Sequence, residues 1–352
     1  MTSVLLTMLL AAAPAQPTTP SPSNENLTRC EYAQVHMGTQ FRIVLYAEKL
    51  DAAQAGAEAA FARIESLDRA LSDYDPKSEL SRLGAASPTP VPVRVSNDLW
   101  PVLVHSQLLA QRSRGAFDIT AGPFTALWRR ARKSGRLPGP DALDAARRSV
   151  GYDQLKLESE ARTAELRAPN MRLDLGGIAK GYAADEALRA LADRGLGRAL
   201  VAAGGDIVVG APPPVKQGWT VAIAPLRSDD GAIVVPELSL VLHNAAVSTS
   251  GDAHQHVVID GVRYSHIVDP RTGLGLTTQT YVTVLAADGM TSDSLATAAS
   301  VLGSKEGLAL LRATPDVKGR IVTVRNGRVE TVATPGFGAR QVQSARLNIV
   351  PQ

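Results

Sequence analysis

Three glycines and a lysine are concentrated in the segment DLGGIAKGYAADEA, residues 174–187. Glycine density between a strand pattern and a helix pattern is typical of backbone that approaches an anion. The order of residues does not match a P-loop, because Lys180 precedes Gly181 and no Ser or Thr follows to hold magnesium. Neither this segment nor AAGGDIVVG, residues 202–210, matches the dinucleotide fingerprint G-x-G-x-x-G. We therefore expect a phosphate-binding loop of another design.

Asp293 and Thr297 are four residues apart in MTSDSLATAAS, residues 290–300. On a helix, such positions project from the same face. A carboxylate and a hydroxyl are hard oxygen ligands, which suit Mg²⁺, an ion that keeps waters and takes further ligands from substrate phosphate. Helix capping by Asp293 or Ser292 is the structural alternative. Zinc is disfavoured, since the histidines lack an HExxH-like spacing and Cys30 is the only cysteine.

Two further polar clusters could carry chemistry. GAFDITAGPFTALW, residues 115–128, places Asp118 and Thr120 among apolar residues, where an Asp could also merely cap a turn. Residues 247–273 hold His254, His256 and His266, and HIVDPRTG ends a strand pattern in a turn, where loop residues tend to carry function. A histidine at such a strand end can equally have a structural role.

Alternating helix and strand signals surround these clusters. Helical spacing of apolar residues predicts helices at 50–74, 97–115, 181–195 and 291–303. Strands are predicted at 37–47, 198–211, 219–225, 238–251, 256–269, 280–287 and 319–327. So many consecutive strands do not fit a doubly wound sheet, and the pattern indicates an α+β fold.

Composition narrows the function classes. The chain has 352 residues, 45% of them hydrophobic, and a net charge of only +3, with no basic stripe interleaved with aromatic residues. Nucleic-acid binding is therefore disfavoured, and the cluster WRRARKSGR, residues 128–136, is interpreted as a solvated helix end. A single cysteine excludes an internal disulfide.

The N-terminus resembles an export signal. Residues 1–15 contain an apolar run too short to span a bilayer, followed by a small-residue cleavage site at Ala13-Pro14-Ala15, although no Lys or Arg precedes the run. Residues 16–30 are rich in Pro, Ser and Thr and are predicted to be a disordered linker. We expect an exported protein, periplasmic or membrane-associated but not itself transmembrane, whose single large domain covers residues 31–345.

Seven motifs, in order, carry a resemblance to a known family. They are HMGTQFRI, SDYDPKSELSRL, GAFDITAGPFTALW, LDLGGIAKGYAADEAL, GGDIVVG, YSHIVDPRTG and TSDSLATA. In this order the chain resembles the ApbE family of FAD:protein FMN transferases from about residue 33 onwards. The resemblance implies a T-fold-related α+β domain with mixed and antiparallel sheets and flanking helices. It also implies Mg²⁺-dependent transfer of the FMN part of FAD to a Thr or Ser hydroxyl of an acceptor protein, with release of AMP.

The resemblance also implies roles for individual residues. The main-chain oxygen of Gly177 and the side chains of Asp293 and Thr297 correspond to the magnesium ligands, and His266 corresponds to the general base. Contacts to FAD are implied for Met37, Tyr74, Ala116, Phe117, Asp118, Asp174, Lys180 and Ile267. An imidazole near its ordinary pKa can accept the proton of an alcohol, so the chemistry of His266 agrees with this role.

Several alternatives stay open at this point. The same site could be a magnesium-dependent FAD pyrophosphatase, with water in place of the hydroxyl, or the chain could bind FAD without catalysis. The acceptor is expected to be another polypeptide, an exported or membrane redox protein, because the nearest acceptor-like stretch here, residues 230–233, ends in Ile233 instead of a hydroxyl residue. After TSG the chain has DAHQH, a departure from the family pattern that leaves acceptor choice and the roles of His254 and His256 open.

Overall fold

The computed structural model describes residues 26–227, 233–251, 255–325 and 327–338. The predicted signal peptide, His254 and residues 339–345 of the predicted domain lie outside these ranges. Within the described part of the chain, no helix combines the length and the apolar character needed to cross a bilayer.

The first strand begins three residues before the predicted domain boundary at residue 31. Strand β1 (Thr28–His36) pairs antiparallel with β2 (Thr39–Ala47), so Thr28, Arg29 and Cys30 belong to a strand and not to the predicted linker. The turn between the two strands consists of Met37 and Gly38, both at positive φ (49° and 71°), which is the conformation of a tight hairpin.

An eight-stranded antiparallel sheet forms the centre of the molecule. Its strand order is β1-β2-β6-β7-β12-β17-β18-β19. The further strands are β6 (Ala199–Ala203), β7 (Asp206–Val209), β12 (Ala245–Ser250), β17 (Gln279–Ala286), β18 (Lys318–Arg325) and β19 (Arg328–Ala333). Burial alternates only at the ends of β17 and β18, and three consecutive residues in the middle of each strand are buried, so both faces of the sheet are covered there.

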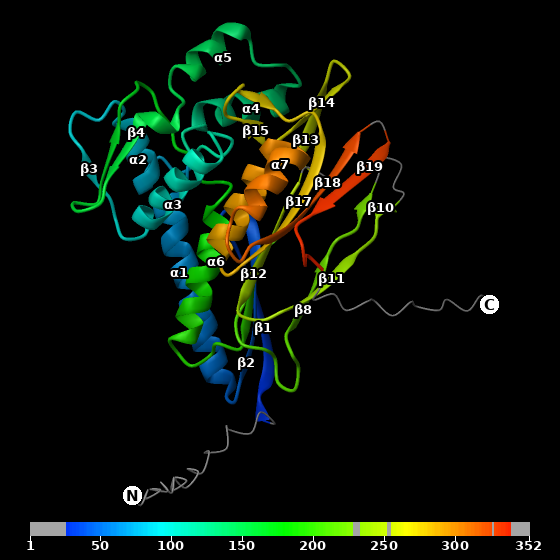
Figure 1. Ribbon diagram of the computed structural model, residues 1–352. Coiled ribbons are helices and arrows are strands. Elements are labelled where there is room, and N and C mark those ends of the chain that lie inside the picture. The colour runs from blue at the N-terminus through cyan, green and yellow to red at the C-terminus, as the bar shows by residue number, and fades with distance from the viewer. Residues whose placement is uncertain (1–25, 228–232, 252–254, 326, 339–352) are drawn as a thin grey trace, which may run out of the picture.

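Three long helices cover one face of this sheet (Figure 1). They are α1 (Leu50–Leu71), α6 (Ala179–Ala192) and α7 (Gly289–Arg312). Their buried residues share one core with β2, β6 and β17, and small side chains such as Ala57, Ala184 and Ala298 allow the helices to approach closely. Helix α7 is interrupted at Gly303, whose φ of 74° is not helical. The helix predicted from the sequence, 291–303, ends at this residue.

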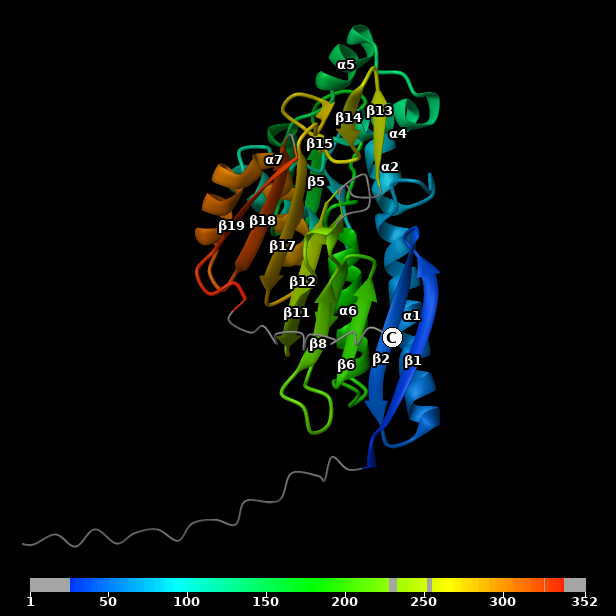
Figure 2. The ribbon, with the colours of Figure 1, turned by 90° about the vertical axis from the view of Figure 1, so that its right-hand side faces the viewer.

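The other face is covered by a short two-stranded sheet, β8 (Trp219–Ile223) with β11 (Leu238–Leu242), in front of the central strands in Figure 2. Trp219, Val221 and Leu240 pack there against Val209 and Val247. A second small pair, β9 (Leu226–Arg227) with β10 (Ile233–Val235), lies beside β18.

The remaining elements gather at the end of the sheet where α1 ends (Figure 1). The helices there are α2 (Glu79–Ala85), α3 (Leu99–Arg112), α4 (Gly122–Ser134), α5 (Pro140–Arg147) and the 3-10 turn η2 (Tyr152–Gln154). The strands are β3 (Val93–Arg94), β4 (Leu155–Glu158), β5 (Thr163–Leu166), β13 (His256–Ile259), β14 (Val262–Ser265), β15 (Val268–Asp269) and β16 (Leu274–Gly275). Helix α4 joins this region, because Phe124 and Trp128 pack against Ile259 and Val268 of the β13–β16 strands.

The α+β prediction, with antiparallel sheets and flanking helices in one domain, is confirmed. The four predicted helices correspond to α1, α3, α6 and the first part of α7. The basic cluster at 128–136 spans the end of α4, which stops at Ser134 before a left-handed Gly135. Strands β1, β3, β4, β9 and β10 and helices α2 and α5 were not predicted, because short or exposed elements have weak periodicity.

Candidate active site

The glycine-rich segment meets the start of α7 through backbone. A Cβ atom on Gly181 would lie 2.1 Å from the carbonyl oxygen of Gly289, and one on Gly289 would lie 2.5 Å from that of Gly181. Both positions must therefore be glycine for the two helices to approach this closely. The Gly181 N–H donates to Asp293 Oδ2 (3.1 Å), so the contact also fixes the Asp293 carboxylate.

Asp185, one turn further along α6, holds the first turn of α7. Its two carboxylate oxygens accept the backbone N–H groups of Gly289 (2.6 Å) and Met290 (2.8 Å), which have no partner inside α7. Burial raises the pKa of Asp185 to about 7, although both hydrogen bonds oppose that shift. The segment AADEA thus orients the helix that carries Asp293 and Thr297.

Lys180 lies between two buried carboxylates. Its Nζ is 2.8 Å from Asp206 Oδ2 on β7 and 3.5 Å from Asp293 Oδ2 on α7. The side chains of Asp206 and Asp293 are only 5% and 7% exposed, whereas that of Lys180 is 27% exposed. Two carboxylates share one ammonium group, so the cluster formally has one negative charge in excess next to solvent.

Burial and mutual charge shift the protonation of this cluster. Burial, together with the negative charge of Asp206, raises the pKa of Asp293 to about 7, although Lys180 and the Gly181 N–H oppose this shift. For Lys180, burial would lower the pKa, but the charges of Asp206 and Asp293 outweigh it and hold the pKa above its ordinary value. Such a site favours the approach of a further cation to the carboxylates.

The oxygen atoms predicted to bind magnesium come from adjoining backbone and side chains. A Cβ on Gly177 would lie 2.9 Å from Thr297 Oγ1, so the bare backbone of Gly177 faces that hydroxyl directly. Thr297 follows Asp293 by one helical turn on α7. A carbonyl, a hydroxyl and a carboxylate fit a hard cation such as Mg²⁺. The described residues contain no group of three His, Cys, Asp or Glu side chains able to hold a metal, so such an ion would depend on these mixed oxygens and on substrate.

Asp174 connects the glycine-rich segment to α4 and to the end of α1. Its Oδ1 accepts from Gly176 N–H (2.8 Å), and its Oδ2 accepts from Arg129 Nη2 (3.0 Å). Arg129 Nη1 also donates to Asp73 Oδ2 (2.5 Å), and its guanidinium carbon lies 4.2 Å from the centre of the Tyr74 ring. Burial and the charge of Asp174 raise the pKa of Asp73, although Arg129 opposes this shift. Two distant segments, one with Asp73 and Tyr74 and one with Asp174, therefore converge on one guanidinium group of α4.

Asp118 is part of a tight turn beside the same segment. Its Oδ1 accepts from both the N–H (2.8 Å) and the hydroxyl (2.7 Å) of Thr120. Burial raises the pKa of Asp118 to about 6, and the Thr120 hydrogen bonds oppose the shift. The backbone of Asp174 donates to the Ile119 carbonyl (2.7 Å), which places this turn against the glycine-rich segment.

Met37 lies in the β1–β2 hairpin turn. Its N–H donates to Asp68 Oδ2 (2.9 Å) near the end of α1, and its side chain packs partly against the main core. Tyr74 follows the same end of α1, only six residues after Asp68, and is 74% exposed. Met37 and Tyr74 therefore lie at one end of α1.

His266 lies between β14 and β15. Its backbone N–H donates to the Gln255 carbonyl (2.9 Å), and its Nδ1 lies 3.1 Å from the same oxygen. A proton on Nδ1 would be donated to this carbonyl, which leaves Nε2 as the acceptor nitrogen. The next residue, Ile267, donates its N–H to the buried Ser265 hydroxyl (3.0 Å).

Comparison with known proteins decides which family has this arrangement. The sequence profile described as the ApbE family matches residues 37–321. The chain belongs to the ApbE family. A protein of Treponema pallidum named FAD:protein FMN transferase is 32% identical over 300 residues, which is 81% of this chain and 82% of the relative. A Haemophilus influenzae protein with the same name is 30% identical over 70% of this chain and 72% of its own length.

Solved ApbE structures share the fold. The flavin transferase ApbE from Vibrio cholerae superimposes with a TM-score of 0.79 at 28% identity, covering 89% of this chain and 99% of that one. The apo flavinyl transferase ApbE from Pseudomonas stutzeri gives 0.76 at 26% identity, covering 89% and 97%. The eight-stranded sheet and its helices are thus those of an ApbE protein.

Against this ApbE fold, the predicted site residues fall into three groups. Gly177, Lys180, Asp293 and Thr297 lie together at the α6–α7 contact. Asp174, Asp118 and Tyr74 are linked to that contact through Ile119 and Arg129. Ala116 and Phe117 are buried, and their backbone N–H groups donate to the carbonyl (3.2 Å) and the hydroxyl (3.0 Å) of Ser113. The roles of all these residues, and of Met37, His266 and Ile267, stay predictions.

Four residues of the site were not singled out from the sequence, and one of them is Asp185, which holds the first turn of α7. Asp206 lies in the motif GGDIVVG, which was used for the resemblance without a role for its carboxylate. Arg129 was assigned to a solvated helix end, yet it contacts two carboxylates and a ring. Asp73 precedes Tyr74 and had no signal of its own. Each of them is recognised only from the group that it contacts, which comes from a distant part of the same chain.

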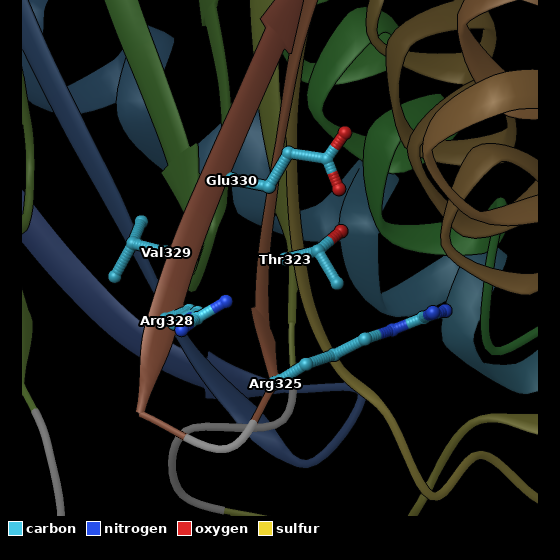
Figure 3. A pocket seen from close by; sticks show the side chains of 5 residues that line it. All are labelled: Thr323, Arg325, Arg328, Val329 and Glu330. Carbon is cyan, nitrogen blue, oxygen red and sulfur yellow. The ribbon is translucent and has the colours of Figure 1, made fainter.

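A hollow of about 670 Å³ lies elsewhere, on β18 and β19. Figure 3 shows the side chains that line it: Thr323, Arg325, Arg328, Val329 and Glu330. No predicted site residue is among them. Charged side chains along this outer strand are typical of a sheet edge that is protected from pairing with another chain.

Proposed function

We propose that this chain is a magnesium-dependent FAD:protein FMN transferase. It transfers the FMN part of FAD to a Thr or Ser hydroxyl of an acceptor protein and releases AMP. Membership in the ApbE family and the names of its relatives support the reaction class. The observation that carries the proposal is the Lys180–Asp206–Asp293 cluster beside the bare backbone of Gly177, because a diphosphate needs cations and open backbone at the same place.

The diphosphate half of the site would be held by the α6–α7 contact. The Gly177 carbonyl, Asp293 and Thr297 would hold Mg²⁺, which when bound draws charge from the diphosphate oxygens. Lys180 adds a positive charge, and Asp174 shapes the loop through its hydrogen bond to Gly176. The wider contact set proposed for FAD is Met37, Tyr74, Ala116, Phe117, Asp118, Asp174, Lys180 and Ile267.

His266 would accept the proton of the acceptor hydroxyl. The hydroxyl oxygen forms a bond to the FMN phosphorus, the bond from that phosphorus to the bridging oxygen breaks, and the bridging oxygen leaves with AMP. The contact of Nδ1 with the Gln255 carbonyl supports this role, because it orients the ring and leaves Nε2 free of a proton.

Two other functions can be compared with this one. A pyrophosphatase would use the same groups with water as the nucleophile, and the partial exposure of His266 admits water as well as a peptide. A non-catalytic FAD-binding protein would have no need for buried carboxylates arranged around a lysine, so the cluster counts against it.

The acceptor and the location are part of the proposal. The acceptor is another polypeptide, since no hydroxyl residue stands at Ile233, and we propose an exported or membrane redox protein. The apolar run within residues 1–15 supports an exported, periplasmic or membrane-associated enzyme.

One experiment separates these functions. The protein is incubated with FAD, Mg²⁺ and a domain that carries a flavinylation motif, and the products are measured by mass spectrometry and nucleotide chromatography. Transfer predicts an adduct of FMN mass on the acceptor and an equal amount of AMP. Free FMN with AMP would favour the pyrophosphatase, and unchanged FAD would favour the binding protein.

A further inference from the structure

Arg129 joins parts of the proposed site that are far apart in the sequence. The guanidinium contacts Asp73, which follows α1, and Asp174, which precedes the glycine-rich loop, at separations of 56 and 45 residues. It also lies over the ring of Tyr74. The side chain is 26% exposed, while those of Asp73 and Asp174 are 17% and 12% exposed, so the ion pairs are shielded from solvent.

The planar guanidinium group of Arg129 connects Asp73 and Asp174 rigidly. One guanidinium nitrogen donates to each carboxylate, and a planar group that makes two such bonds cannot rotate. The same plane lies 4.2 Å from the Tyr74 ring centre, within the range of a cation–π contact. Holding the guanidinium therefore also holds the ring.

Tyr74 is unusual for an aromatic residue in such a contact because it stays 74% exposed. With the guanidinium on one face of the ring, that exposure leaves area for a second flat group to stack. Asp174, which also accepts a hydrogen bond from Arg129, shapes the turn at Gly176 that precedes the proposed diphosphate contacts. A ring platform and a phosphate loop are thereby fixed relative to each other.

We propose that Arg129 is a positioning residue that fixes the exposed Tyr74 ring relative to the Asp174–Gly176 turn, so that a flat ring of a dinucleotide and its diphosphate are held together. This inference rests on the proposed function for the identity of the dinucleotide. Its geometric content, one guanidinium that orders both parts, does not require the transfer step.

The test measures nucleotide affinity in the absence of any acceptor protein. Arg129→Lys keeps the charge but cannot make two planar hydrogen bonds and cover the ring. We expect it to raise the Kd for FAD about tenfold, as the sum of a cation–π contact and two shielded charge pairs suggests. Arg130→Lys, on the neighbouring exposed residue of α4, is the matched control and should leave the Kd within about twofold.

Variants of Tyr74 show whether Arg129 acts through the ring. Tyr74→Phe keeps the ring and should bind FAD as the original chain does, whereas Tyr74→Ala should weaken binding about as much as Arg129→Lys. In the double variant, the second change should add less than about twofold, because both remove the same platform. Independent, multiplying effects would overturn the proposal.

Separate ligands identify which flat ring stacks. If the platform serves the flavin, Arg129→Lys weakens binding of FMN, and if it serves the adenine, it weakens binding of ADP. An unchanged affinity for FAD, FMN and ADP in a folded Arg129→Lys protein, with the original chain binding FAD, would overturn the proposal. Should Arg129→Lys not fold, the Tyr74 pair alone decides the platform. The acceptor assay fails independently if the transfer function is wrong.

Discussion

The start of α7 and the β13–β16 strands are built in opposite ways. At the start of α7, Asp293 is buried, receives a backbone N–H from α6 and lies near Lys180. His105 on α3 contacts the next residue, Ser294 (2.9 Å), so two helices, α3 and α6, hold this turn of α7. In the β13–β16 region the strands are only two to four residues long, and Val258 is 59% exposed.

The difference indicates that the two regions have separate functions within the proposed site. Buried charges are tolerated only where their partners are fixed, so a diphosphate and a cation are best held by the α6–α7 contact. A protein substrate must reach the reacting group from outside, so His266 is best placed on an exposed hairpin region.

The largest effect is expected from Asp293→Ala. This change removes the only carboxylate among the predicted magnesium ligands, and we expect magnesium-dependent release of AMP from FAD to fall by about a thousandfold or more. Chromatography of the nucleotides measures the loss, and urea unfolding checks that the protein remains folded. Release of AMP at the original rate would remove the metal assignment.

Gly181→Ala tests whether the close backbone contact between α6 and the start of α7 stabilises the protein. The new Cβ would lie 2.1 Å from the Gly289 carbonyl oxygen, so the helices must separate, and we expect a loss of unfolding free energy of about 3 kcal/mol or more. Chemical denaturation measures it. Gly139→Ala is the matched control, since a Cβ there meets nothing within 4 Å and its φ of −66° suits alanine. Equal stability of the two variants would contradict the packing argument.

The buried carboxyl group of Asp118 makes the stability of the protein depend on pH. Its pKa is about 6 in the folded protein, above the ordinary 3.8, so the folded state binds more protons between these values. The free energy of unfolding should therefore fall as pH rises through this window, by at most about 3 kcal/mol.

Asp118→Asn can keep the oxygen that accepts both Thr120 hydrogen bonds and does not titrate. Subtracting its pH profile from that of the original chain isolates the effect of Asp118. Denaturation curves at pH 4, 5, 6 and 7 provide the measurement. If the difference in unfolding free energy between the two proteins stayed constant across these pH values, burial would not raise the pKa of the Asp118 carboxyl.

His266→Ala tests the proposed function of the exposed β13–β16 region. We expect transfer to an acceptor threonine to fall about a hundredfold, while the Kd for FAD changes by less than about twofold, because a general base acts on the hydroxyl and not on the bound nucleotide. The exposed His243, outside the proposed site, supplies the control His243→Ala. Equal losses of binding and transfer would argue that His266 is a binding residue instead.

Part of the site could be predicted from local spacing. The separation of Asp293 and Thr297 places both on one face of a helix wherever that helix lies. Gly177 and Gly181 indicated backbone contact, and the structure shows which backbone and side chain each one meets. Arg129 could not be predicted, because a basic residue near a helix end usually faces solvent, and its partners lie 45 and 56 residues away.

By itself, the sequence determined the α+β composition, the helical face that carries Asp293 and Thr297, and the family, because these depend on periodicity and on ordered local motifs. Only the tertiary structure decided that Lys180 lies between Asp206 and Asp293, and that Arg129 connects Tyr74 with Asp174. The physical reason is that periodicity specifies which face of an element is buried but not which partner it meets. Partners are chosen by packing between segments that the chain order keeps apart.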